Sequence, residues 1–224
     1  MKKMDLRNAR ELQRRRDNRE MILRAAEAVI LRQGFSAASM DGVAEEAQFS
    51  KATLYRYFRS KSELVFEILT QFLEDMSRRL REVRTQPKNA RERMRDWVSC
   101  LLHSLSEKEN ITRIFLLDRS FMKVLQIFVA KQSPSGTEAE KKFIQKIKVK
   151  RKEMIEESRI LLKEGMASGE FRPMDLDAGV TFIEAVIEGY FVEKFRMETQ
   201  PDIEKDIAHI HGFILGGIEN KQVS

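Results

Sequence analysis

Apolar residues recur every three to four positions along most of the chain, which is the spacing of amphipathic helices. Four prolines, ten glycines and three tyrosines, set against many Leu, Ile, Ala, Glu, Lys and Arg, leave little material for hairpins. The pattern therefore predicts an all-α fold. At 224 residues the chain can hold one large domain or two small ones.

Three helices are predicted in the first quarter of the chain. The first begins near Asn18 and ends at Gly34, which stands where a left-handed C-terminal cap belongs. The second follows Ser39 as its cap and ends near Ala47, and the third follows Ser50. Two short helices joined by about three residues form a helix-turn-helix, whose apolar faces the first helix would cover.

The third helix separates a core face from an exposed face. At about 100° per residue, Leu54 and Phe58 fall on the same side, where they would hold the helix against a core. The opposite side and its flanks carry hydrogen-bond donors, a small residue, a cation and two phenols: Ala52, Thr53, Tyr55, Arg56 and Tyr57. Such a face suits the floor and walls of a DNA major groove.

Several short motifs follow one another between Ile22 and Leu64. They are A-A at 25–26, G-F at 34–35, S-M at 39–40, V-A at 43–44, S-K-A-T-L-Y-R-Y-F at 50–58 and S-K at 60–61. In order and spacing, this run resembles the DNA-binding domain of the tetracycline-repressor (TetR) family. Gln48 departs from the family pattern, which usually has Gly there, so this position must accept a side chain at positive φ or shift its angles.

The candidate DNA contacts fall into two groups. The residues predicted to read base edges are Lys51, Thr53 and Arg56, with Ala52 on the same face. The residues predicted to hold backbone phosphates are Ser39, Tyr55, Tyr57 and Lys61. For the two tyrosines, plain packing in the aromatic-rich turn is the alternative interpretation.

A long helix is predicted to link this module to the rest of the chain. Ser60 and Glu63 form a capping box at its start, and its apolar stripe continues to Val83 before Pro87. A small rotation of such a rod would move the recognition helix. The expected division of the chain is a basic flexible arm or frayed helical extension over 1–17, a helix-turn-helix domain over 18–64 and a helical effector-binding and dimerisation domain over 65–224.

The second domain is predicted to contain further helices and a ligand pocket. The last two helices, about 175–198 and 202–219, could close the core, and the resemblance implies that they pair with a second copy as a four-helix bundle. Aromatic and Met residues at helical spacing are most often core residues, and some would line a pocket. The candidates are Trp97, Phe115, Phe121, Met122, Phe128, Phe143 and Phe182.

The basic charge is concentrated at one end of the chain. Residues 1–61 hold 14 Lys and Arg against 8 Asp and Glu, and the remainder holds 27 of each class. A local basic surface on an N-terminal domain suits a polyanion, although a solvated basic tail would give the same composition. Charge alone does not separate DNA from RNA or anionic lipid.

Little in the sequence suggests catalysis, a metal site or a membrane span. The chain has no P-loop, no dinucleotide-binding glycine pattern and no nucleophile elbow, and His209 and His211 would point apart on a helix. Cys100 lies in an apolar helix, where a thiol is usually a small buried hydrophobe. We therefore expect no catalytic residue, no metal and no cofactor. Without a long apolar run or a signal-peptide core, we expect a cytoplasmic protein that does not enter a membrane.

These patterns predict a DNA-binding transcriptional regulator and not an enzyme. By the resemblance, it would be a repressor that binds a near-palindromic operator as a homodimer and is released by a small, hydrophobic effector. Two alternatives stay open: a DNA-binding regulator controlled by a protein partner instead of a small molecule, and a basic helical adaptor on anionic membrane surfaces.

Overall fold

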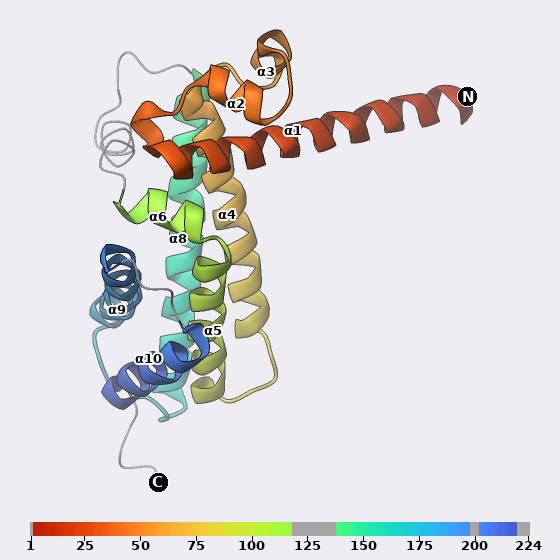
Figure 1. Ribbon diagram of the computed structural model, residues 1–224. Helices are drawn as coiled ribbons and strands as arrows, with labels where there is room; N and C mark the ends of the chain where they lie inside the picture. The colour runs from red at the N-terminus through yellow and green to blue at the C-terminus, as the bar shows by residue number, and fades with distance from the viewer. Residues whose placement is uncertain (1, 118–137, 198–201, 219–224) are drawn as a thin grey trace. The chain divides into compact units, whose positions relative to one another are not determined.

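The computed structural model describes residues 2–117, 138–197 and 202–218, and every element in these ranges is an α-helix. The all-α prediction is confirmed. The helices are α1 (Lys2–Ala37), α2 (Met40–Glu46), α3 (Lys51–Tyr57), α4 (Lys61–Arg84), α5 (Ala90–Glu107), α6 (Glu109–Leu117), α8 (Glu138–Ala167), α9 (Leu176–Arg196) and α10 (Ile203–Ile218) (Figure 1). The segment 121–128, which contains three of the candidate pocket residues, lies outside these ranges.

The chain forms two compact units. Unit 1 contains α1, α2, α3, the part of α4 up to Leu69 and the first turns of α8. Unit 2 contains the remainder of α4 and α8 together with α5, α6, α9 and α10. Because α4 is one uninterrupted helix, it begins in unit 1 and ends in unit 2.

The helix α1 is longer than its apolar pattern indicated. It starts at Lys2 instead of Asn18, so the predicted arm is helical in the structure. Gly34 interrupts it with φ 78° and ψ 159°, a combination that essentially only glycine adopts. Residues Ile22, Ala26, Val29 and Ile30 are at most 1% exposed and form the core side of the helix, as their spacing predicted.

Hydroxyl caps begin the three helices that follow, each at the serine expected from the sequence. Ser39 Oγ accepts the Gly42 N–H at 3.1 Å, and Ser50 Oγ accepts the Thr53 N–H at 3.1 Å. Ser60 Oγ accepts the Glu63 N–H at 3.1 Å, while the Glu63 carboxylate accepts the N–H of Arg59 and not that of Ser60. Each cap satisfies a donor that a helix start leaves free.

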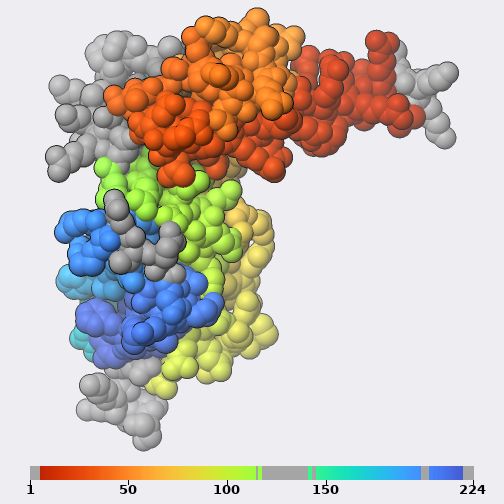
Figure 2. All heavy atoms as spheres, in the orientation of Figure 1, coloured from red at the N-terminus to blue at the C-terminus, as the bar shows by residue number. Residues whose placement is uncertain are grey.

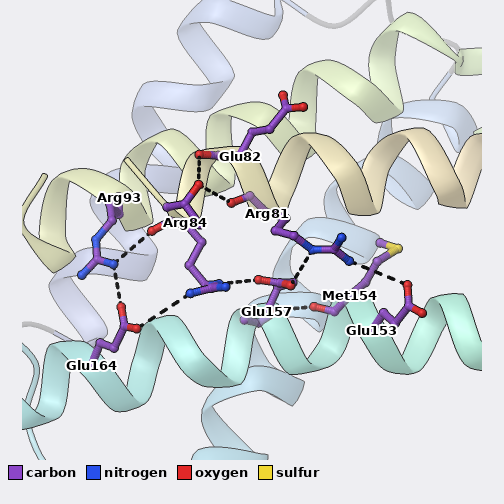
Figure 3. A network of polar contacts seen from close by, with 10 residues as sticks. Arg81, Glu82, Arg84, Arg93, Glu153, Met154, Glu157 and Glu164 are labelled. Atoms are coloured by element: carbon purple, nitrogen blue, oxygen red, sulfur yellow. Dashed lines mark hydrogen bonds and ion pairs between the residues drawn. The ribbon is translucent and has the colours of Figure 1, made fainter. Parts of the chain in front are cut away.

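In unit 2, α4, α5 and α8 are joined by charged side chains (Figure 3). Glu157 of α8 is only 8% exposed and pairs with Arg84 and with Arg81, whose Nε lies 3.2 Å from Oε1. Arg93 of α5 donates to Glu164 at 2.6 Å and to the Arg84 carbonyl at 3.1 Å. Since removing one partner would leave a buried charge unpaired, the network holds the C-terminal end of α4 in place.

Two boundaries in unit 2 agree with local sequence to different degrees. Ser106 and Glu109 have the spacing of a capping box, but α5 runs through Ser106 to Glu107 and α6 begins at Glu109, so no helix starts at Ser106. Gly169 follows the end of α8 with φ 77°, the conformation in which glycine commonly ends a helix. None of the described helices is both long enough and apolar enough to cross a membrane.

Candidate DNA-binding surface

The helix α3 is held by one face and presents the other. Leu54 and Phe58 are completely buried, whereas Ala52 and Arg56 are exposed and Tyr55 is 49% exposed. The contrast follows from the wheel, since residues four apart share a face and those two positions away lie nearly opposite. At seven residues, the helix depends on this packing for its stability.

Lys51 begins α3 and makes an ion pair with the preceding helix. Its Nζ lies 2.6 Å from Asp41 Oδ2, and both side chains are more than half exposed. The hydrogen bond and the charge of Asp41 raise the pKa of Lys51. Exposed pairs of this kind contribute little stability, so the ammonium can exchange Asp41 for another anion at small cost.

Two hydroxyl groups near the helix starts keep a proton to donate: that of Ser39, which caps α2, and that of Thr53 in the first turn of α3. Thr53 Oγ1 accepts from Ser50 Oγ at 2.9 Å, which leaves the Thr53 O–H available to a partner outside the chain. Ser39 is exposed and accepts from the backbone, so its O–H is available in the same way. Both residues therefore lie where a phosphate or a base edge could be bound.

The two tyrosines of α3 differ in their surroundings. Tyr57 is half-buried, and its hydroxyl accepts a hydrogen bond from Asn18 Nδ2 of α1 at 3.2 Å. Arg19, the next residue of α1, stacks over the Phe58 ring at 4.4 Å and lies 3.3 Å from Glu67. Periodicity within α1 did not predict these contacts of Asn18 and Arg19. Their partners Tyr57, Phe58 and Glu67 lie about forty to fifty residues further along the chain.

Lys61 has an intramolecular role that its position in the sequence did not indicate. Its Nζ lies within 3.0 Å of the carbonyl oxygens of Phe35, Ser36 and Ala38, and 4.6 Å from the centroid of the Phe35 ring. The ammonium thus binds the segment that follows Gly34 and leads into α2. Its predicted phosphate contact stays a prediction, which must compete with these three acceptors.

The turn between α2 and α3 is built around a residue with positive φ. Gln48 has φ 57°, the single positive value outside glycine among the described residues. Of the two outcomes expected at this position, the backbone keeps the left-handed conformation and the side chain is exposed. The Gln48 N–H bonds to the Glu45 carbonyl at 3.0 Å, and the Phe49 N–H bonds to the Ala44 carbonyl at 2.9 Å.

A basic groove of about 810 Å³ lies between α1 and α3 within unit 1. The α3 side contributes Tyr57 and the predicted readers Thr53 and Arg56, and the turn before α3 contributes Phe49. The α1 side contributes Glu11, Leu12, Arg14, Arg15, Arg16, Asn18 and Arg19. The sequence revealed this run of arginines as a charge excess but did not indicate that it adjoins the recognition helix.

The predicted ligand-pocket residues are only partly described by the structure. Trp97 of α5 is 2% exposed, and its indole nitrogen has no hydrogen-bond partner among the described residues. Phe182 of α9 is 69% exposed and lines a groove between α9 and α10. The side chains of Phe115 and Phe143 and the whole of Phe121, Met122 and Phe128 lie outside the described residues. The structure thus describes the side chains of Trp97 and Phe182 alone among the seven candidates, and the predicted pocket stays a prediction.

No group of three His, Cys, Asp or Glu side chains in the described parts of the chain is arranged to hold a metal ion. Cys100 is half-buried, and burial raises the pKa of its thiol. Among the described residues, the exposed donors and cations of α3 and of the side chains beside it are therefore the strongest candidate for a binding surface.

Comparison with known proteins agrees with this geometry. Residues 22–68 match the model of the tetR family of bacterial regulatory proteins. The helix-turn-helix transcriptional regulator YhgD of Bacillus subtilis is 28% identical over 162 residues, which cover 71% of this chain and 74% of that protein.

Two solved structures share the fold. The fatty acid degradation regulator FadR of Bacillus halodurans has a TM-score of 0.72 at 18% identity, covering 89% of this chain and 95% of its own. FadR of Bacillus subtilis, solved in complex with stearoyl-CoA, has a TM-score of 0.71 at 19% identity, covering 89% and 99%. With the matched helix-turn-helix and the exposed face of α3, residues 22–68 form a DNA-binding domain of the tetR family, and the chain is a DNA-binding transcriptional regulator of that type.

Proposed function

We propose that the chain is a repressor that binds a near-palindromic operator as a homodimer and is released by a small hydrophobic effector. The DNA-binding part of this proposal is supported by the two faces of α3: Leu54 is fully buried, while Ala52 and Arg56 are exposed. A dimer would place two such helices about 34–36 Å apart, one turn of the duplex, or further for a longer site.

Within each half-site, the residues of α3 take different roles. Arg56 can pair with a guanine through two hydrogen bonds, while Lys51 and Thr53 reach base edges from the start of the helix. The methyl group of Ala52 leaves room for a close approach. Ser39, Tyr55 and Tyr57 are positioned around this face, where donors contact phosphates and set the orientation on the duplex.

The homodimer would form through α9 and α10. Phe182 and Phe213 are 69% and 71% exposed in the single chain, and they line an apolar groove of about 400 Å³ between the two helices. A Cβ added at Gly212, Gly216 or Gly217 would meet no atom within 4 Å. Large exposed aromatics beside open glycines support close approach of a second copy, and each contact would occur twice about a two-fold axis.

The dimer is tested by Phe213→Asp. Because this side chain is exposed in the protomer, the substitution should leave the fold intact but would bury a charge in the interface. Sedimentation should then give a monomer. A matched change, Val149→Asp at an exposed apolar position of α8 in unit 2, should leave the dimer unchanged. A dimeric Phe213→Asp protein would exclude this surface.

For the effector, Trp97 is the residue with the strongest structural support. A buried N–H without a partner costs about 1–3 kcal/mol, and an acceptor on a ligand would recover that cost. FadR of Bacillus subtilis, which shares this fold, binds stearoyl-CoA, so acyl-CoA thioesters are the first compounds to test. Because Trp97 is the single tryptophan, its fluorescence reports binding directly.

The effector would act through α4. This helix begins directly after α3 and ends where Arg84 pairs with buried Glu157. A ligand that binds better to the arrangement unable to hold DNA would shift the population, and a difference of about 3 kcal/mol changes operator affinity by roughly a hundredfold.

One experiment addresses these parts together: a footprint on the DNA upstream of the chain's own gene, with and without acyl-CoA. We expect two protected half-sites related by a two-fold axis. Acyl-CoA should abolish this protection over the same concentration range in which it changes Trp97 fluorescence. Protection that persists with every ligand tested, while a protein partner abolishes it, would favour the protein-controlled regulator. No protection, with binding to anionic vesicles that survives loss of Arg56 and Tyr57, would favour the membrane adaptor.

A further inference from the structure

The N-terminal part of α1, residues 2–17, is a basic helix outside the core of unit 1; we call it the basic extension. It contains seven Lys and Arg against three Asp and Glu, and every side chain from Leu6 to Asp17 is exposed. We propose that the basic extension is a second DNA-binding element, which contacts the phosphate backbone next to the base pairs read by α3. This inference rests on the proposed function, because it requires binding of duplex DNA through α3.

The conformation of the basic extension suits a rigid backbone contact. Its helix continues without interruption into the docked part of α1, so it avoids the cost of helix nucleation that a separate segment would meet. In Figures 1 and 2 its turns extend beyond α2 and α3. Sixteen helical residues span about 24 Å, enough to follow roughly seven base pairs of one strand.

Contacts at the root of the basic extension fix its direction relative to α3. Asn18 donates a hydrogen bond to the Tyr57 hydroxyl at 3.2 Å. Arg19 stacks on Phe58 at 4.4 Å and pairs with Glu67 at 3.3 Å. Because Tyr57 and Phe58 belong to the recognition helix and its C-terminal cap, DNA bound by α3 would meet the basic extension at a defined position.

The charges on the two sides of the basic groove favour a polyanion. Arg14 and Arg16 from α1 and Arg56 from α3 have no side-chain partner among the described residues. Arg15 is paired with Glu11 of its own helix at 3.4 Å, and both side chains are more than half exposed. Glu11 also lines the groove and would face the duplex less favourably than its neighbours. Several like charges around one groove repel one another, and a row of phosphates would offset that repulsion.

A membrane surface explains the same residues less well. Leu6 and Leu12 are 61% and 57% exposed, but they lie six positions apart, so they point to different sides of the helix. Without a continuous apolar face, the basic extension cannot insert as an amphipathic helix does. Its place beside the recognition helix favours DNA.

The test replaces the three consecutive arginines with a neutral helix former, in the variant Arg14→Gln/Arg15→Gln/Arg16→Gln. The matched control, Lys108→Gln/Lys152→Gln/Lys163→Gln, removes the same charge from exposed positions of unit 2 outside α9 and α10. Fluorescence anisotropy between 50 and 300 mM KCl would use two probes: the fragment upstream of the chain's own gene and a random 30-base-pair duplex. Circular dichroism would verify that both variants keep their helix content.

We expect the arginine variant to bind both probes at least tenfold more weakly at 100 mM KCl. The slope of log K against log salt should fall by about 2.7 per protomer, since each lost phosphate contact contributes about 0.9. The control should match the wild-type protein. Trypsin cleavage after Arg14, Arg15 and Arg16 of the wild-type protein should slow when the random duplex is present.

Three results would overturn the proposal, and they are distinguishable. An arginine variant with wild-type affinity and slope would refute the basic extension alone, provided that Arg56→Ala still weakens binding to the upstream fragment. Loss of binding to phosphatidylglycerol vesicles with unchanged DNA binding would assign the basic extension to a membrane. A wild-type protein that binds neither probe would remove the proposed function and the inference with it.

Discussion

Replacing Lys61 with methionine should destabilise unit 1 and leave the salt dependence of DNA binding nearly unchanged. The methionine keeps most of the aliphatic length but removes the ammonium that lies within 3.0 Å of the Phe35, Ser36 and Ala38 carbonyls. These acceptors belong to the connection that follows Gly34. The three donors of the ammonium are therefore engaged within the chain, and a phosphate would have to displace a carbonyl to be bound.

The expected loss follows from those contacts. A hydrogen bond to a charged group contributes about 1.5–3 kcal/mol, and a cation near an aromatic ring adds about 0.5–1 kcal/mol at an accessible site. Ser36 and Ala37 are exposed, so water can replace part of the lost bonding. We therefore expect a net cost of about 2–3 kcal/mol, which corresponds to faster local opening by roughly 30- to 150-fold.

Hydrogen exchange measured by mass spectrometry reports the local stability of each unit separately, whereas a single melting curve does not. Peptides covering residues 31–45 should exchange faster in Lys61→Met, whereas peptides covering 155–170 in unit 2 should not change. Lys205→Met is the matched control, because Lys205 is exposed in unit 2. Anisotropy with the upstream fragment across a salt series gives the second measurement.

The two roles of Lys61 predict opposite results. A phosphate contact would lower the salt slope by about 0.9 per protomer without altering exchange near residues 31–45. That outcome would refute the reasoning from the carbonyl contacts and would support the role expected from the sequence.

Three further predictions concern the recognition helix, the turn and the pH response. Arg56→Ala should relax base preference at one position of each half-site, at a cost of about 1–3 kcal/mol for the preferred base, as measured by selection from random duplexes. Gln48→Gly should stabilise the chain by up to about 1 kcal/mol and Gln48→Val should destabilise it, because φ is 57° and the side chain is exposed; urea unfolding measures both. For His103, burial lowers the pKa, but the hydrogen bonds that its ring donates to the Glu204 carboxylate and the Ser99 carbonyl outweigh burial and raise the pKa above its ordinary value of 6.5. The contact between α5 and α10 should thus contribute fully below pH 6.5 and weaken as the pH rises through the folded-state pKa, so the stability difference between wild type and His103→Gln should shrink from pH 6 to pH 8.

Each of these predictions has a result that contradicts it. Unchanged base preference in Arg56→Ala would mean that Arg56 contacts phosphate. Equal stability of the glycine and valine variants at position 48 would mean that the turn relaxes away from its positive φ. A stability difference for His103→Gln that grows with pH would show that the pair with Glu204 does not control the histidine.

Much of the helical framework was predictable from local sequence. The caps at Ser39, Ser50 and Ser60 lie where a hydroxyl precedes an apolar-periodic run, because a cap depends on residues within one turn of it. Leu54 and Phe58 are buried as their four-residue spacing requires. The face of α3 that is offered to DNA follows from the same periodicity.

Only the tertiary structure showed which distant groups meet. Lys61 bonds to carbonyls 23 to 26 residues earlier, and Asn18 bonds to a tyrosine 39 residues later. Phe182 has an ordinary core pattern in the sequence, yet it is 69% exposed beside α10. Periodicity defines one face of one helix, whereas a contact between faces depends on how separate helices pack. For that reason the sequence by itself determined the recognition helix α3, whereas only the tertiary structure showed that the basic extension lies beside it.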